Sequence, residues 1–197
     1  IAKADLALSI TMTFVSTLLA PLMIPLMMQI YASQWIEINA KALFLTSIQI
    51  VLLPLVIGLL IKTIIKDRFT NPINNSASLV SIFFVSLIVH TMVASNFDKF
   101  KQIDNFSESF LLLILVIVLH NALGYITAYY SAKFFTKIDT DQLKTISIEV
   151  GVQNSGLASV LALMYFHPLS VIPSVISASW HSISGSALAN YWAKKTS

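Results

Sequence analysis

The chain has 197 residues, of which 56% are hydrophobic and 11% charged, with a mean hydropathy of +0.80 and a formal net charge of +3. These values exclude an ordinary soluble domain, and the absence of cysteine excludes disulfides and thiolate metal sites. Uncharged apolar runs of about 20 residues, enough to cross a bilayer, recur along the sequence. They predict an all-α, polytopic membrane protein with six transmembrane helices.

The first predicted span, Leu6 to about Tyr31, opens with hydroxyl side chains. Ser9, Thr13 and Ser16 fall at i, i+4 and i+7, on one stripe of a helix. Such hydroxyls commonly bond to carbonyls of their own helix or join it to a neighbour, and that interpretation stays open beside a ligand role. The second span, Ala42 to about Ile61, contains no ionisable group.

Three of the four later spans contain no formally charged side chain. The third runs from about Ala77 to Ser95, the fourth from Phe110 to Ala132, and the last from about Leu169 to Trp192. His120 and Asn121 lie in the middle of the fourth span, where buried His and Asn usually fix one helix against another. We favour that packing role over direct contact with a substrate.

The fifth span carries the polar stretch IEVGVQNSG, residues 148–156. Its Glu149 is the only formally charged side chain between Thr145 and Ala193, and a charge at membrane depth costs roughly 2.5 to 3.5 kcal/mol on insertion scales. Gln153, four residues on, is expected to share a helical face with it. The glycines of the stretch predict a broken helix, whose freed carbonyls hold a coupling cation in many secondary transporters.

Sodium is the first candidate for that cation, because the surrounding side chains offer neutral oxygen ligands. Proton coupling through Glu149 is the alternative, since a buried carboxyl binds a proton unless a nearby cation keeps it ionised. His181 in the last span is either a satisfied buried histidine or a ligand-facing one. The sequence contains no nucleophile elbow, HExxH pair, P-loop or Rossmann glycine pattern, so we do not expect an enzyme.

Basic residues predict the orientation of the chain. Nine of the twelve fall on the side that holds both chain ends and three on the other, which by the positive-inside rule places both ends in the cytoplasm of a cell (inner) membrane protein. These residues flank membrane spans and do not cluster with aromatic residues, so no nucleic-acid partner is expected. Three of the nine, Lys133, Lys137 and Lys144, are assigned to the connection between the fourth and fifth spans.

The stretches TISIEVGVQNSGLASVLA, LHNALGY, SWHSISGS, LANYWA and LALSITMTFVSTLLAPL together resemble the bile acid:sodium symporter family. The resemblance implies a fold of ten transmembrane helices in two inverted five-helix repeats, of which the six spans match the fifth to the tenth. It also implies a core-domain helix over residues 1–31, panel-domain helices over 32–97, and core-domain helices over 98–197 with a broken helix at 148–156.

The resemblance further implies two sodium sites and a substrate site. One sodium would bind Ser9, Thr13 and Glu149, and the other Glu149, the carbonyls of Val150 and Val152 and the amide of Gln153, each completed by residues upstream of Ile1. The substrate is an organic anion, such as a bile acid or a small carboxylate. It would lie near Asn154, His181 and Ser182, where the bacterial relatives carry Asn in place of Ser182.

The expected function is therefore sodium-coupled symport by alternating access, with sodium ions, an organic anion and the lipid bilayer as partners. Because the chain starts at Ile1, we expect it to be a piece of a longer protein whose N-terminal transmembrane helices complete the sites. Two alternatives remain, a non-transporting membrane scaffold or partner subunit and a proton-coupled carrier.

Overall fold

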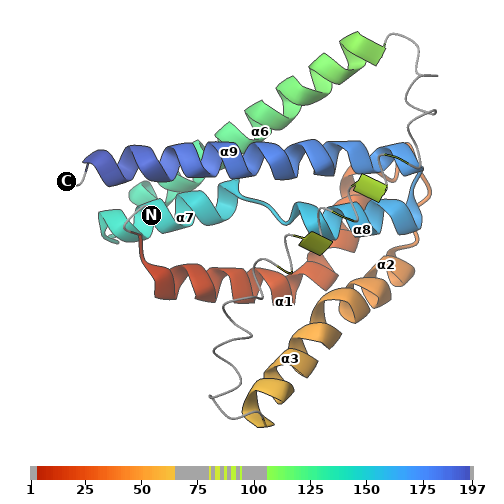
Figure 1. Cartoon of the computed structure of the whole chain (residues 1–197), viewed down its shortest axis with the longest axis horizontal. Helices are drawn as coiled ribbons and strands as arrows, with labels where there is room; N and C mark the ends of the chain where they lie inside the picture. The colour runs from red at the N-terminus through yellow and green to blue at the C-terminus, as the bar shows by residue number, and fades with distance from the viewer. Residues whose placement is uncertain are drawn as a thin grey trace. The chain divides into compact units, whose positions relative to one another are not determined.

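A computed structural model describes residues 4–64, 80, 83–84, 87, 90–91, 94 and 106–195 of the chain. Within these residues the secondary structure is helical throughout (Figure 1). The elements are α1 (Leu6–Tyr31), α2 (Ala40–Ser47), the π-helix η1 (Ile48–Leu52), α3 (Leu53–Ile64), α6 (Phe106–Phe135), α7 (Thr140–Gly151), α8 (Ser155–Tyr165), the 3-10 helix η2 (Pro168–Val171) and α9 (Ile172–Lys195).

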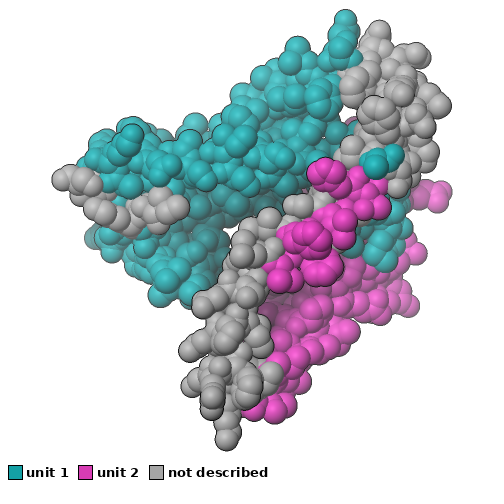
Figure 2. Space-filling model, in the orientation of Figure 1, with its two compact units in different colours: residues 1–13, 92–197 teal, residues 14–91 magenta. Residues whose placement is uncertain are grey.

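The chain forms two compact units (Figure 2). Unit 1 contains Ile1–Thr13 and Met92–Ser197, and unit 2 contains Phe14–Thr91. Helix α1 therefore begins in unit 1 and ends in unit 2. The division into core and panel domains stays a prediction.

Among the described residues, four helical stretches are long and apolar enough to cross a membrane. This confirms the prediction of a helical protein with segments that could span a membrane. They are Leu6–Tyr31, Ala40–Ile61, Ser107–Phe135 and Thr140–Tyr165, and they coincide with the first, second, fourth and fifth predicted spans. The third predicted span lies mostly outside the described residues. The last corresponds to α9, which has 24 residues but carries many serines, so it is less apolar than the four.

Unit 2 contains a local change of helix type next to a proline. The five residues of η1 form a π-helix directly before Pro54 in α3. Proline has no N–H to donate and its ring clashes with the carbonyl four residues earlier. A wider turn relieves that clash, so the second span continues through the proline without ending.

In unit 1, α6 and α7 approach closely at a pair of glycines. A Cβ placed on Gly124 would lie 3.3 Å from the Cα of Gly151, and a Cβ on Gly151 would lie 2.2 Å from Cδ1 of Tyr125. The ring of Tyr125 therefore occupies the space that any side chain at Gly151 would need. The same pair of helices is joined where the Ser147 hydroxyl donates to the Tyr125 carbonyl at 2.9 Å.

Helix α7 begins earlier than the charge pattern suggested. Asp139 caps it by accepting from the Gln142 N–H, and the Gln142 side chain returns to the Asp139 N–H in a capping box. Lys133 lies in the last turn of α6, so the prediction that it and Lys144 belong to the connection between the fourth and fifth spans was wrong. Lys144 lies inside α7. It is buried, with an exposed fraction of 3%, and its ammonium pairs with Asp141 at 2.8 Å.

The fifth predicted span is two helices separated by a short break. Helix α7 ends at Gly151, α8 begins at Ser155, and Asn154 caps α8 by accepting from the Leu157 N–H at 3.0 Å. Helix α9 packs against α6, α7 and α8 (Figure 1). The helices that precede and follow the break in the chain therefore pack beside it, while Val152, Gln153 and Asn154 are exposed.

Replacing Gly151 with alanine should lower the free energy of unfolding by about 1–3 kcal/mol, because the added methyl group displaces the Tyr125 ring. Gly58→Ala is the matched control, since a Cβ there meets nothing within 4 Å and alanine favours a helix by up to about 1 kcal/mol. Thermal unfolding in detergent measures both. Equal stability of the two variants would contradict the close packing at Gly151.

Candidate functional site

The Glu149 carboxylate accepts hydrogen bonds from two hydroxyls of α1. The Ser9 hydroxyl donates to Oε1, and the Thr13 hydroxyl donates to Oε2 at 2.8 Å. All three residues belong to unit 1. A hydroxyl that donates its single proton keeps its lone pairs, so Ser9 and Thr13 present acceptor oxygens beside the carboxylate. Ser9 and Thr13, two members of the helical stripe read from the sequence, thus contact Glu149.

A second set of contacts, one helical turn earlier, aligns α1 with α7. The Asp5 N–H donates to the Thr145 hydroxyl at 2.8 Å. Asp5 also caps α1, because its carboxylate accepts from the Leu8 N–H at 3.0 Å. From Asp5 to Ser9 and from Thr145 to Glu149 the chain advances four residues in each helix, so the two helices run parallel and in register.

At the break, side chains replace two backbone hydrogen bonds of a continuous helix. In a continuous helix the N–H of Gln153 would donate to the carbonyl of Glu149. In this structure it donates instead to Nδ1 of His181 at 3.3 Å. The carbonyl of Gly151 accepts from Nδ2 of Asn121 at 2.8 Å, while the Ser155 N–H donates to the Gln153 carbonyl at 3.0 Å. The break is therefore non-helical, and side chains from neighbouring helices pair the Gln153 N–H and the Gly151 carbonyl.

Gln153 lies outside both helices, so the expectation that it shares a helical face with Glu149 was wrong. The physical reason is that α7 ends at Gly151, two residues before it. Its side-chain nitrogen lies 2.7 Å from Nε2 of His120 on α6. His120, for which a packing role was favoured over direct substrate contact, is thus the side-chain partner of a predicted sodium ligand.

Val150 and Val152, whose carbonyls were predicted to bind sodium, flank the last residue of α7 and have exposed fractions of 44% and 40%. The Val152 N–H closes the final helical bond to Ile148 at 2.8 Å. Among the described residues, no backbone N–H in or next to the break donates to the Val150 carbonyl. Carbonyl, hydroxyl, amide and carboxylate oxygens are the ligand types that hard cations prefer.

The three residues predicted to contact substrate have different environments. Asn154 is exposed and caps α8. His181 is buried, and its Nε2 lies 3.1 Å from the Ser177 hydroxyl. Ser182 is exposed and donates to the Ala178 carbonyl of its own helix at 3.0 Å. Since Nδ1 of His181 accepts from Gln153, both ring nitrogens already have partners; substrate contact by these three residues stays a prediction.

Several residues of this site escaped the reading of the sequence. In the sequence, Asp5 resembles an ordinary helix cap, Thr145 resembles an ordinary helical threonine, and Ser184 is one serine among several. Asp5 and Thr145 contact each other although they are 140 residues apart in the chain. Only the polarity of these positions within apolar surroundings was a usable signal.

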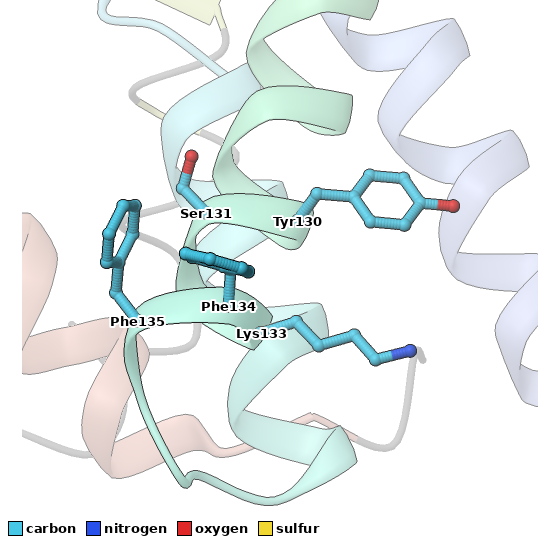
Figure 3. A pocket seen from close by; sticks show the side chains of 5 residues that line it. All are labelled: Tyr130, Ser131, Lys133, Phe134 and Phe135. Carbon is cyan, nitrogen blue, oxygen red and sulfur yellow. The ribbon is translucent and has the colours of Figure 1, made fainter.

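A shallow hollow of about 570 Å³ lies elsewhere, at the end of α6 (Figure 3). Tyr130, Ser131, Lys133, Phe134 and Phe135 line it, and all of them come from little more than one turn of a single helix. One helical turn cannot enclose a small molecule. The break at Glu149 remains the candidate site.

The helices and the carboxylate at a broken helix define a polytopic α-helical membrane protein. Residues 1–103 match the family described as the sodium bile acid symporter family. The chain belongs to this family, as the resemblance indicated. The family and the named relatives are transporters and not enzymes.

Two relatives show how much of a family member the chain represents. The uncharacterized sodium-dependent transporter YocS of Bacillus subtilis is 40% identical over 195 residues, covering 99% of this chain and 58% of that protein. The chloroplastic probable sodium/metabolite cotransporter BASS1 of Arabidopsis thaliana is 32% identical over 198 residues, covering 98% of this chain and 46% of that protein. The chain therefore spans about half the length of these relatives.

Thr145→Val should weaken the alignment of α1 with α7, because valine keeps the shape of threonine and removes the acceptor for the Asp5 N–H. We expect a loss of about 1–3 kcal/mol of unfolding free energy, typical of a buried polar group left without its partner. Thr127→Val is the control, since exposed Thr127 donates to a carbonyl of its own helix. Thermal unfolding measures both, and equal melting temperatures would argue against the alignment.

Proposed function

We propose that the protein is a sodium-coupled symporter that moves an organic anion across the cell (inner) membrane by alternating access. The observation that carries the proposal is the Glu149 carboxylate, which receives the Ser9 and Thr13 hydroxyls where α7 ends. A half-buried carboxylate beside neutral oxygens suits a monovalent cation, since one negative charge balances one positive charge. The printed names of the relatives, a sodium-dependent transporter and a sodium/metabolite cotransporter, support the choice of sodium.

Two sodium ions would use the predicted ligands. Ser9, Thr13 and Glu149 would hold one, and Glu149 with the carbonyls of Val150 and Val152 and the Gln153 amide oxygen would hold the other. Each set leaves coordination positions for oxygens from elsewhere. We propose that N-terminal helices preceding Ile1 in the full-length protein supply them, and that the six spans of this chain correspond to helices five to ten of the inverted-repeat fold.

The substrate would be a bile acid or a small carboxylate, bound near Asn154 and the pair His181 and Ser182. Asn154 is exposed, and the N-termini of helices favour anions, so the start of α8 is a suitable place for a carboxylate. Sodium in the break would stabilise this arrangement of α7 and α8. Substrate affinity would then depend on sodium by linkage.

Glu149→Ala in the full-length protein should abolish sodium-driven uptake, because it removes the charge shared by both proposed sodium sites. Uptake of a radiolabelled bile acid and of small carboxylates into proteoliposomes under an inward sodium gradient measures the effect. Glu108→Ala, at the exposed first turn of α6, is the matched control and should transport normally. Sodium-dependent uptake by the Glu149 variant would overturn the proposal, and uptake that follows a pH gradient without sodium would establish the proton-coupled alternative.

A second experiment separates a divided site from a self-contained one. Sodium, compared with potassium at equal ionic strength, should raise the melting temperature of the full-length protein and leave this 197-residue piece unchanged. The expected difference arises because ligands upstream of Ile1 are needed to close each site. A selective response of the piece itself would show that its own helices hold all the ligands.

A further inference from the structure

The carbonyl of Gly151 ends a chain of hydrogen bonds that crosses three helices. Ser184 of α9 donates its hydroxyl to Oδ1 of Asn121 at 2.8 Å, and Nδ2 of Asn121 donates to the Gly151 carbonyl at 2.8 Å. The Tyr125 hydroxyl lies 3.1 Å from the Ser184 hydroxyl. Asn121 has an exposed fraction of 1%, so water does not compete for these bonds.

The direction of every bond in this chain follows from the number of protons available. A serine hydroxyl has one proton, and Ser184 gives it to Asn121, so Tyr125 must be the donor in its pair with Ser184. The Asn121 amide is fixed as well, because a flipped amide would place its oxygen against the Gly151 carbonyl. Tyr125 therefore donates to Ser184, Ser184 donates to Asn121, and Asn121 donates to the carbonyl of Gly151.

This series of hydrogen bonds ends beside the proposed sodium ligands. Gly151 lies between Val150 and Val152, whose carbonyls are the proposed sodium ligands. Each carbonyl belongs to its own rigid peptide plane, and the Gly151 plane is joined to its two neighbours at the Cα atoms of Gly151 and Val152, so holding it restricts both. In a continuous helix the Ser155 N–H would bind the Gly151 carbonyl, but it binds Gln153 instead. Asn121 takes the place of that backbone donor, and so it fixes the orientation of the last peptide group of α7.

Packing supports the same role. The Tyr125 ring covers the Cα of Gly151, and a Cβ on Gly185 would lie 3.4 Å from the Tyr125 hydroxyl and 3.3 Å from a methyl group of Val152. Glycines on α7 and α9 thus let the tyrosine hydroxyl reach Ser184 while the ring holds the end of α7. The hydrogen bonds and the close packing constrain the same peptide groups.

We propose that Asn121 is a positioning residue for the cation site, oriented by Tyr125 and Ser184, and that it acts by holding the Gly151 carbonyl so that the carbonyls of Val150 and Val152 face the ion. This inference rests on the proposed function, because it assumes that sodium binds at the break. Asn121 itself is not a ligand, since both ends of its amide are occupied by Ser184 and Gly151.

Asn121→Asp tests the proposal in the full-length protein, because aspartate has nearly the same shape but no Nδ2 donor. We expect sodium affinity, measured as the midpoint of the sodium-induced thermal shift, to fall by about 10–100-fold, as when the partner of a metal ligand is removed. Asn121→Ala should give a loss of the same order, which excludes the new charge as the cause. Asn190→Asp, on the exposed part of α9, is the matched control and should bind sodium as the wild type does.

Tyr125→Phe gives a milder variant that keeps the ring on Gly151 and removes only the first donor. It should reduce sodium affinity by a smaller factor, about 2–10-fold, and its effect should vanish in the Asn121→Ala background because the chain is already broken there. A purely structural role would instead lower the melting temperature without sodium and leave the sodium midpoint unchanged. That result would overturn the inference.

The two proposals fail in different ways. If the wild-type full-length protein shows no selective response to sodium, the proposed function is wrong. If the wild type responds and the Asn121 variants respond at the same sodium concentration, the proposed function stands and the positioning role is wrong. A loss of sodium affinity confined to the Asn121 and Tyr125 variants, with Asn190→Asp unchanged, supports both.

Discussion

The structure depends on how a helix can be interrupted inside a membrane. Unpaired backbone groups at membrane depth cost several kcal/mol each, so a break survives only where neighbouring helices supply partners. His181 of α9 accepts from the Gln153 N–H, and Asn121 of α6 donates to the Gly151 carbonyl. These two side chains satisfy two of the groups that a continuous α7 would have paired internally. The surrounding helices are therefore required by the break and not merely packed near it.

The same break explains why the glycines and small hydroxyls lie where they do. Gly124 and Gly151 allow α6 and α7 to come close enough for a short side chain to reach a backbone carbonyl. Bulkier residues would separate the helices by more than the reach of Asn121. Close approach, hydrogen bonding and the release of the Val150 and Val152 peptide groups are thus consequences of one packing arrangement.

Glu149 supplies the negative charge of the site, and α1 supplies the hydroxyls that bind its carboxylate. The contact between Asp5 and Thr145 fixes the register of α1 against α7 one turn before Ser9 meets the carboxylate. Because both helices advance four residues between these contacts, the hydroxyl pair reaches Glu149 without distortion of either helix. A carboxylate, two hydroxyls and the freed carbonyls of a helix end form an oxygen-rich site.

The sequence by itself determined the helical class, the position of the charged residue, the polar stretch that interrupts the fifth span and the hydroxyls of the first. These are local properties, set by hydropathy, spacing and the glycines near Glu149. The tertiary structure alone decided which side chains complete the break and where Gln153 points, since the contacts made by His181 and Asn121 join residues 28 and 30 positions apart. It also decided that Lys144 is buried in α7 and that Asp5 aligns α1, because hydrogen bonds between distant helices depend on packing and leave no periodic signal in the chain.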